Sequence, residues 1–337
     1  MTSSDPFGTL CRSWDRAVRV SAQAEQLVLR ADMHEKDDRF KGFSQLVGEQ
    51  AFCRIQSSSV CVVGLGGVGS WVVEALARSG VGALTLVDLD EVCITNINRQ
   101  VQATSSTVGE LKADLLARRV RDINPDCLVQ ALPKFFTRSS VEHILGLRPD
   151  LVVDTIDRAE NKALLIAECV ARGIRVVTAG SAGDRLDPSA VTSCDLSLTV
   201  HDPLLQIVRK DLRGRYGFPR GDRSRFNVPC VYVPKQRNHS GTQCEGAVTR
   251  KSCNDGLGSA VFVTGAVGFM AASVAVRMLA EDAPREVYPW YRKRLDALAD
   301  GGEIVVARNG CNLKKEDPEP ELACAGSGGP SSQRTIG

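Results

Sequence analysis

The sequence of 337 residues lacks several features that would direct attention to particular functions. Its twelve cysteines contain no Cys-x-x-Cys pair, which argues against a zinc ribbon or a thioredoxin-type redox pair. Its four histidines show no metal-ligand spacing, and aromatic residues make up only 5% of the chain. The 42 basic residues nearly balance the 40 acidic ones. The net charge of +2 therefore predicts no global basic field for tRNA, DNA or an anionic membrane.

We expect no secretory signal segment at the start of this sequence, because charged side chains interrupt its first thirty residues. Several cysteines, such as Cys61, Cys93 and Cys169, lie within apolar runs, where a free thiol behaves as a small hydrophobic group. We therefore expect a reducing, cytoplasmic setting. Arginines in residues 1–38 give a weak presequence character, so a mitochondrial setting is one alternative.

One long uncharged stretch is present, over residues 256–276, and its 21 residues would be enough to cross a bilayer. It is rich in small residues, which allow close packing against neighbouring helices in a membrane or in a soluble core. We expect an apolar helix over 256–279 that is buried in the core or in a dimer. Membrane association is the alternative.

Composition divides the chain into three parts. We expect an N-terminal extension over 1–38, a globular domain over 39–306 and a disordered tail over 307–337. The tail is dominated by charged residues, proline, glycine and serine, a composition that buries no core.

The globular part alternates short apolar runs with longer helical patterns. The expected strands are 60–63, 83–87, 127–131, 151–153 and 175–178, and the helices between them are 68–79, 109–123, 138–146 and 159–172. Such alternation implies right-handed crossovers and a mostly parallel sheet. The predicted fold class is thus α/β and Rossmann-like.

A glycine-rich loop, Gly64-Leu-Gly66-Gly67-Val-Gly69, joins the first expected strand to the first helix. This spacing provides a tight turn, close approach of backbone to a phosphate, and close packing of the helix on the strand. The helix N-terminus adds N–H groups that bind anions. Asp88 closes the second strand, where a carboxylate accepts hydrogen bonds from ribose hydroxyls.

Charged and amide side chains follow the carboxyl ends of the expected strands. Such side chains are better suited to binding a triphosphate than a nicotinamide. Ligands of open parallel sheets bind outside the carboxyl ends of the strands, so these side chains are expected to share one crevice. Cations neutralise phosphate charge, and carboxylate oxygens suit Mg²⁺. The candidate nucleotide ligands of this group are Asp90, Asn96, Asn98, Arg99, Lys112 and Asp157.

The combination of Gly-x-Gly-Gly-Val-Gly-Ser, Asp-x-Asp, Asn-x-x-Arg-Gln, Lys-Ala and a strand ending in Asp resembles the ubiquitin-activating-like ThiF/MoeB superfamily of adenylating enzymes. The resemblance runs from about Arg39 to Arg277 and implies the superfamily's C-terminal extension after the nucleotide-binding part. By matched position it implies glycines 64, 66, 67 and 69 near the ATP phosphates and Asp88 at the ribose. Phosphates would be held by Asn96, Arg99 and Lys112, and Mg²⁺ by Asp157.

The resemblance also implies a homodimer, in which Arg39 reaches the ATP of the partner subunit. The implied catalytic residues are Arg39, Arg99, Lys112 and Asp157.

Segments at 39–49, 123–125, 202–204, 229–232 and 253–259 resemble the tRNA threonylcarbamoyladenosine dehydratase branch. This resemblance implies that ATP adenylates the threonyl carboxylate of the modification on adenosine 37, after which the ring closes within the modification and AMP leaves. The first alternative is an adenylating activator of a ubiquitin-like or sulfur-carrier protein, whose family members usually carry Cys-x-x-Cys pairs. The second is a non-catalytic scaffold. A sulfur-transfer protein partner is compatible with the resemblance, and the sequence does not identify one.

Ring closure within the substrate requires no enzyme nucleophile. We therefore expect Cys230 to be a packing thiol, with a thioester route as the alternative.

One segment, residues 209–225, carries seven basic and two acidic residues, a net +5 that leaves −3 for the rest of the chain. Tyr216, Phe218 and Phe226 are interleaved with or follow the charges, as expected of a recogniser of single-stranded RNA loops. The hypothesis is a tRNA-binding loop without a DNA partner, and its alternative is a solvated helix end. Its basic residues are Arg209, Lys210, Arg213, Arg215, Arg220, Arg223 and Arg225.

Overall fold

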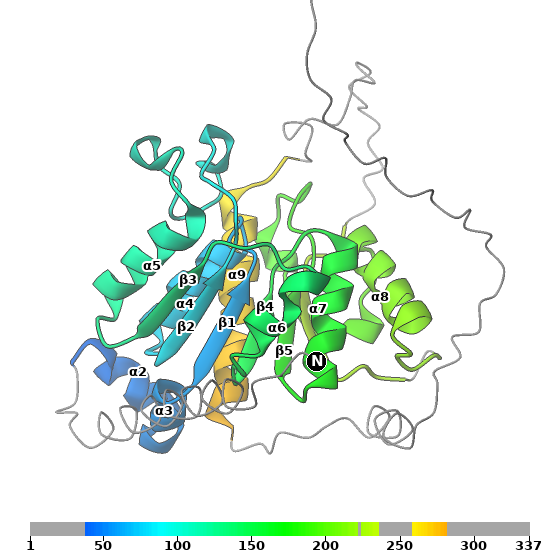
Figure 1. Ribbon diagram of the computed structural model, residues 1–337, viewed down its shortest axis with the longest axis horizontal. Coiled ribbons are helices and arrows are strands. Elements are labelled where there is room, and N and C mark those ends of the chain that lie inside the picture. The colour runs from blue at the N-terminus through cyan, green and yellow to red at the C-terminus, as the bar shows by residue number, and fades with distance from the viewer. Residues whose placement is uncertain (1–37, 222–223, 236–257, 282–337) are drawn as a thin grey trace, which may run out of the picture. The chain divides into compact units, whose positions relative to one another are not determined.

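The computed structural model describes residues 38–221, 224–235 and 258–281 (Figure 1). Most of the predicted N-terminal extension, Arg223, residues 256 and 257 and the whole predicted tail lie outside these described residues.

Seven strands form one sheet in the order β3-β2-β1-β4-β5-β7-β6. Five of them lie where the sequence predicts, and all neighbouring pairs are parallel except β6 with β7. The α/β prediction is confirmed. The strands are β1 Ser59–Val63, β2 Ala83–Val87, β3 Leu128–Leu132, β4 Leu151–Asp154, β5 Arg175–Ala179, β6 Thr192–Asp195 and β7 Pro229–Tyr232.

Strands β6 and β7 were not predicted from the sequence. Both are only four residues long, and β6 (Thr-Ser-Cys-Asp) carries no apolar run that would mark a strand. In the sheet, β7 pairs with β5 and β6 pairs with β7, so the two strands extend the sheet beyond β5.

Helices flank the sheet on both faces and cover its lower edge in the view of Figure 1. The α-helices are α2 Lys41–Val47, α3 Glu49–Gln56, α4 Gly69–Arg78, α5 Lys112–Ile123, α6 Val141–Leu145, α7 Ala159–Ala171, α8 Pro203–Arg215 and α9 Val261–Ala280. Short 3₁₀ turns are η1 Asp38–Phe40, η2 Ile94–Asn96, η3 Ser105–Thr107, η4 Arg138–Ser140, η5 Pro188–Ala190 and η6 Leu196–Leu198.

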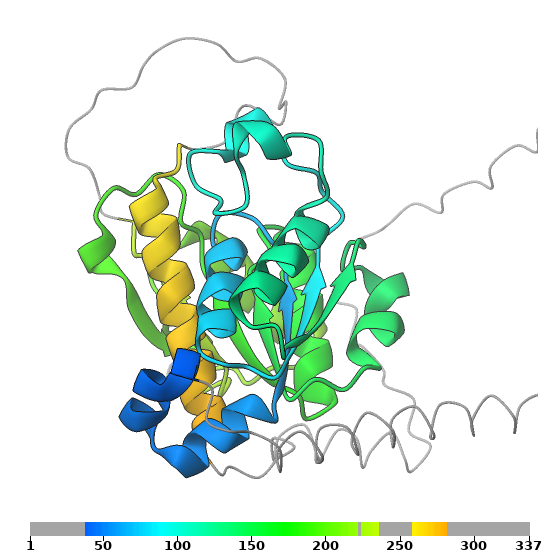
Figure 2. The same cartoon turned by 90° about the vertical axis from the view of Figure 1, so that its left-hand side faces the viewer.

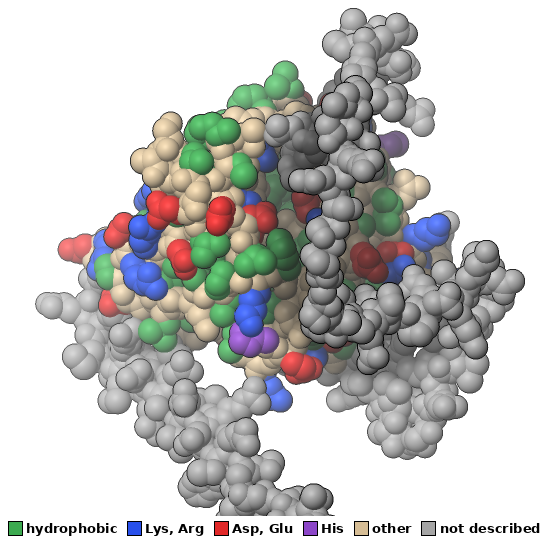
Figure 3. All heavy atoms as spheres, turned by 45° about the horizontal axis from the view of Figure 1, so that its top comes forward, with side chains coloured by type: hydrophobic (Ala, Val, Ile, Leu, Met, Phe, Trp, Pro, Cys, Tyr) green, Lys and Arg blue, Asp and Glu red, His purple; other side chains and the backbone are tan. Residues whose placement is uncertain are grey.

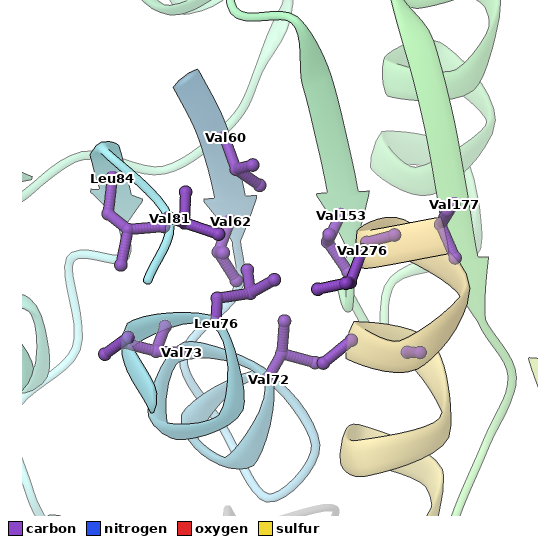
Figure 4. Packing of buried hydrophobic residues seen from close by; sticks show 14 of the residues in the cluster. Val60, Val62, Val72, Val73, Leu76, Val81, Leu84, Val153, Val177 and Val276 are labelled. Carbon is purple, nitrogen blue, oxygen red and sulfur yellow. The ribbon is translucent and has the colours of Figure 1, made fainter. Parts of the chain in front are cut away.

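The core has two halves because successive residues of each strand point to opposite faces of the sheet. Val60, Val62 and Val153 point toward α4 and α9 (Figure 4). Cys61 and Val63 belong to the second cluster, with residues of α6, α7 and α8. Strands buried on both faces explain why the sequence shows continuous apolar runs there rather than alternation.

Helix α9 corresponds to the uncharged stretch of the sequence and begins at Val261. Among the described helices it is the one long and apolar enough to cross a membrane, by length and composition alone. In the structure it packs along α4 and against β5 and β7 (Figure 2). Val263, Val267 and Ala271 are fully buried there, so α9 serves as a core helix of the domain.

The strand order reverses direction between β1 and β4, which are neighbours in the sheet but far apart in the chain. Loops from the two strands diverge at such a point and leave a crevice at the carboxyl edge of the sheet. The glycine-rich loop follows β1, Asp88 follows β2, and Asp157 lies three residues beyond β4. The fold therefore brings these segments to one edge.

Candidate active site

The glycine-rich loop is held tightly between β1 and β4. Gly64 has a φ of +90°, and a Cβ there would lie 3.0 Å from the Thr155 carbonyl oxygen. A Cβ on Gly69 would overlap the Gly64 carbonyl oxygen, and the Thr155 hydroxyl donates to that oxygen at 2.5 Å. These contacts require glycine at positions 64 and 69, as predicted for the turn and for close helix–strand packing.

The middle of the loop faces open space. No described atom lies within 4 Å of the position of a Cβ on Gly66. A Cβ on Gly67 would meet the Arg99 side chain at 3.3 Å and the Thr264 methyl group at 3.2 Å. The loop thus offers exposed backbone beside an arginine, which is the arrangement that a bound phosphate needs.

Asp88 is buried directly after β2. Its Oδ2 accepts from the Leu65 backbone N–H at 2.6 Å, and its Oδ1 accepts from the Asp90 N–H at 2.8 Å. Burial raises the pKa of this carboxyl, against the lowering effect of these hydrogen bonds and of Lys112. Asp88 therefore connects the glycine-rich loop to the segment after β2, and each oxygen keeps acceptor capacity for a ribose hydroxyl.

Lys112 and Asp90 form an ion pair at the start of α5. The Lys112 Nζ lies 2.9 Å from Asp90 Oδ2, and the Lys112 side chain is 7% exposed against 52% for Asp90. Because the Asp90 carboxylate is exposed, a phosphate oxygen can replace it as the partner of the buried Lys112 ammonium.

Arg99 is anchored by its backbone and by its side chain. Its carbonyl oxygen accepts hydrogen bonds from Trp71 Nε1 at 3.0 Å and from the Thr264 hydroxyl at 3.4 Å. Its guanidinium donates to the Thr95 carbonyl oxygen at 2.6 Å and to Asn98 Oδ1 at 3.1 Å. Helix α9 is therefore part of the site through Thr264. This role was not predicted, because nothing in the uncharged stretch 256–276 indicates a contact with the nucleotide-binding segments.

The two asparagines of this segment have structural partners. Asn96 is buried, and its Oδ1 accepts from the Cys93 N–H at 3.1 Å, which closes the turn η2. Asn98 Nδ2 donates to the Ser259 carbonyl oxygen at 2.9 Å and links the segment to the residues before α9. Both residues shape the backbone that presents Arg99.

Asp157 is exposed beyond β4, and its carboxylate has no hydrogen bond or ion pair among the described residues. No cluster of three or more His, Cys, Asp or Glu side chains within those ranges is arranged to hold a metal. This arrangement fits Mg²⁺, which is usually bound through one or two carboxylates together with substrate phosphates and water.

A fully buried ion pair lies directly beneath this segment and was not predicted. Lys162 Nζ donates to Asp154 Oδ2 at 2.9 Å, and both side chains are 0% exposed. The Thr178 hydroxyl donates to the same oxygen at 2.7 Å, and the Ile156 N–H donates to Asp154 Oδ1 at 3.1 Å. The only sequence signal was a lysine within an apolar helix face, at the fifth residue after Asp157.

Arg39 does not join the site within one chain. It lies in η1, beside α2 and α3, at the edge of the sheet where β1 begins. The neighbouring Phe40 contacts the region of Gly80, which follows the C-terminal end of α4. Figure 2 shows these blue helices at the end opposite to the cyan loops that carry Asn98 and Arg99.

The described part of the predicted RNA-binding segment consists of the end of α8 and a loop. Lys210, Arg215, Arg220 and Arg225 are exposed. Arg215 pairs with Glu160 at 3.0 Å. Arg209 is partly buried and donates to the Thr199 hydroxyl. Arg213 lies over the Phe226 ring at 5.1 Å from its centroid.

The interleaved aromatic residues do not form a stacking surface. Phe218 is 3% exposed and Phe226 is 0% exposed, and their rings meet edge to face with centroids 5.0 Å apart. The expectation that they stack on RNA bases was wrong for these two residues, because they anchor the loop to the core beside α7 and α8. At the carboxyl edge of the sheet, Figure 3 shows acidic and basic side chains interspersed with hydrophobic ones.

Cys230 lies in β7 and is fully buried. Burial raises the pKa of its thiol well above the ordinary value. A thiol that remains protonated and inaccessible is a poor nucleophile. The structure therefore favours the packing role over the thioester.

A family model for the ThiF family matches residues 41–300, so the chain belongs to the ThiF family. It is 40% identical over 255 residues to a tRNA threonylcarbamoyladenosine dehydratase of Haemophilus influenzae. This alignment covers 75% of this chain and 97% of that enzyme. Identity to the Escherichia coli enzyme of that name is 39% over 256 residues, covering 74% and 96% of the two chains.

The crystal structure of the E. coli tRNA N6-threonylcarbamoyladenosine dehydratase aligns with a TM-score of 0.64 at 38% identity, over 72% of this chain and 93% of that chain. The same enzyme has also been solved in complex with ATP and in complex with AMP.

Proposed function

We propose that this chain is an ATP-dependent dehydratase that cyclises N6-threonylcarbamoyladenosine at position 37 of tRNA. The observation that carries this proposal is the 40% identity that extends over 97% of the Haemophilus enzyme, rather than over the nucleotide-binding part alone. The crevice at β1 and β4, with its open glycine-rich loop, supplies the nucleotide site that such an enzyme requires.

The chemistry begins with a carboxylate, which is a poor electrophile until one of its oxygens becomes part of a leaving group. A threonyl carboxylate oxygen attacks the α-phosphorus of ATP, the bond to the β-phosphate breaks, and pyrophosphate leaves. A nucleophilic atom of the same modification then attacks the activated carbonyl carbon, gives up its proton, and displaces AMP. The carboxylate loses one oxygen and the modification loses a water overall.

The residues of the crevice contribute charge and position. Arg99 and Lys112 neutralise negative charge that builds up on the phosphates, and Asp88 orients the ribose. Lys112 is held by Asp90 until phosphate replaces this carboxylate. Because both reacting groups of the ring closure belong to the substrate, positioning replaces the need for an enzyme nucleophile.

We also propose that Mg²⁺ accompanies ATP, with Asp157 as its protein ligand. The Asp157 carboxylate is exposed and has no hydrogen-bond or ion-pair partner in the part of the chain that the structure describes, and the backbone of the neighbouring Thr155 and Ile156 lies against Gly64 of the glycine-rich loop, which supports this assignment. The ion would neutralise phosphate charge.

The decisive experiment incubates the protein with ATP and with tRNA that carries threonylcarbamoyladenosine, followed by mass analysis of the nucleosides. The wild type should release a nucleoside that has lost one water. Lys112→Met should slow the reaction about 100-fold or more, the size expected for loss of a transition-state charge partner. Arg121→Met, which removes an exposed charge at the far end of α5, is the matched control. ATP binding without any loss of water would reject the dehydratase and favour activation of a carrier protein.

The remaining proposals concern assembly and location. Within one chain, Arg39 and the nucleotide site lie at opposite ends of the sheet. In a homodimer, Arg39 of one chain would reach the nucleotide site of the other. Phe262 and Phe269 support a packing surface for such a dimer, because these α9 side chains are 50% and 49% exposed and Trp71 lies edge-on against Phe269.

We also propose that the enzyme is cytoplasmic, because its tRNA substrate is available there. Recovery of all activity in carbonate-washed membranes would contradict this location.

A further inference from the structure

A cavity of about 480 Å³ is lined by none of the residues assigned to the nucleotide site. Segments that follow β5 and β7 line it together with the residues just before α9. Its volume falls in the range of small-molecule sites in proteins. The lining includes the charged residues Asp184, Arg185, Asp187 and Lys235, and also Leu186, Ala190, Pro234 and Ser259.

The cavity and the nucleotide site share a wall. Ser259 lines the cavity, and its carbonyl oxygen accepts the hydrogen bond from Asn98. Five residues further along the chain, Thr264 of α9 lies against the position of Gly67 in the glycine-rich loop. The cavity therefore adjoins the phosphate-binding residues at the first turn of α9 and the segment before it.

Two charged side chains face each other at the cavity, at 2.5 Å between Lys235 Nζ and Asp184 Oδ2. The two side chains are 46% and 43% exposed, so this pair is open to exchange of partners. Their backbones are held in place. The Lys235 backbone N–H donates to the His201 carbonyl oxygen at 2.8 Å, and the backbone N–H of Asp184, a residue with a φ of +58°, donates to the Gly258 carbonyl oxygen at 2.7 Å.

The other cation of the cavity, Arg185, is already engaged. Its Nε donates to the Val233 carbonyl oxygen at 2.8 Å, and its Nη2 lies 3.5 Å from Asp202 Oδ2. Its side chain is 5% exposed. Arg185 therefore builds the wall, and among the described lining residues Lys235 is the cation open to a ligand.

We propose that this cavity binds the modified adenosine of the tRNA, with Lys235 pairing to the carboxylate of the amino-acid arm. The inference rests on the proposed function and assigns the subsite of its second substrate. Leu186, Ala190 and Pro234 give an apolar wall against which a base face packs, while the ammonium selects a carboxylate-bearing base over a plain adenosine. Lys235 holds the carboxylate while the substrate docks, and the carboxylate then moves into the nucleotide crevice, where it attacks the α-phosphorus of ATP.

The test compares two anticodon stem-loops, one with threonylcarbamoyladenosine and one with unmodified adenosine. Lys235→Met should raise the Kd of the modified stem-loop about tenfold, because a charge-assisted hydrogen bond is lost, and leave the Kd of the unmodified one unchanged. Lys235→Arg should stay near the wild-type value. Asp184→Asn should bind the modified stem-loop more tightly, since it frees the ammonium and removes a like charge. ATP affinity should be unchanged in all three variants.

Equal effects of Lys235→Met on the two stem-loops, or no effect on either, would overturn the assignment. Arg121→Met controls for a general loss of positive charge, and thermal melting confirms that each variant is folded. Turnover by the wild type distinguishes failure of the cavity assignment from failure of the proposed function. If the wild type converts modified tRNA and Lys235→Met binds normally, only the cavity assignment fails. If the wild type binds both stem-loops equally and converts neither, the proposed function fails and the assignment with it.

Discussion

At the scale of single residues, the buried pair of Asp154 and Lys162 sets the geometry beneath the nucleotide crevice. It joins the end of β4 to α7, and the Thr178 hydroxyl brings in β5. Burial raises the pKa of Asp154, whereas Lys162 opposes that effect, so the carboxylate depends on its partner to remain charged. The turn that presents Asp157 starts from this carboxylate, because the Ile156 N–H is bound to it.

Removing one partner of this pair should therefore lower the free energy of unfolding far more than removing both partners. We expect Lys162→Met to lower the free energy of unfolding by about 3–5 kcal/mol, the usual penalty for leaving one buried charge unpaired. The double variant Asp154→Leu with Lys162→Met should recover much of this loss. Urea denaturation of the two variants and the wild type measures the difference. A double variant that is less stable than Lys162→Met would contradict the explanation from an uncompensated charge.

At the scale of elements, α9 couples the core to the site. One side of the helix contacts α4, which begins at the last glycine of the phosphate-binding loop. A Cβ on Gly268 would lie 2.7 Å from the Trp71 Cβ and 2.8 Å from the Val68 carbonyl oxygen. Gly265, one turn earlier, has no neighbour closer than 3.9 Å at the corresponding position.

These two glycines give a matched pair of substitutions in one helix. Gly268→Ala should destabilise the protein by about 1–3 kcal/mol through overpacking and should weaken ATP binding, because Val68 belongs to the loop. Gly265→Ala should leave ATP binding unchanged and stabilise the helix by up to about 1 kcal/mol, through the better helix propensity of alanine. Thermal melting and ATP titration check both variants. Equal losses in the two would show that any added methyl group disturbs α9.

At the scale of the whole molecule, the nearly neutral net charge hides local differences. The exposed basic residues at the end of α8 lie on the α7 side of the sheet, and Arg215 is paired with Glu160 of α7. The cavity and nucleotide crevice occupy the carboxyl edge of the strands. A tRNA that enters the crevice would therefore need a contact surface that extends from this edge toward α8.

We infer that the exposed basic residues contribute to tRNA affinity through phosphate contacts rather than through aromatic stacking. A triple variant of Lys210, Arg220 and Arg225 to alanine should weaken tRNA binding and flatten its salt dependence, by about one unit of slope for each phosphate contact that is lost. Filter binding over a range of salt concentrations measures both. A triple change of Arg118, Arg121 and Arg148 is the charge-matched control, and equal losses in the two proteins would place the tRNA elsewhere.

The sequence by itself determined the parts that depend on local pattern. Apolar runs and helical spacing identified five strands and the helices between them, and the glycine spacing identified the phosphate-binding loop, since a turn and a close approach impose their residues locally. The segments after β2 and β4 could be assigned to one crevice because parallel strands end at one edge.

Only the tertiary structure decided the features that join distant segments. It buried Phe218 and Phe226, paired Asp154 with Lys162, made α9 a wall of the site through Thr264, and assembled the cavity of Lys235 and Asp184 from three separate loops. Each depends on which side chains meet across the sheet, and no spacing in the chain specifies such long-range contacts. For the same reason, the balance of 42 basic against 40 acidic residues says little about tRNA binding unless the position of each charge in the structure is known.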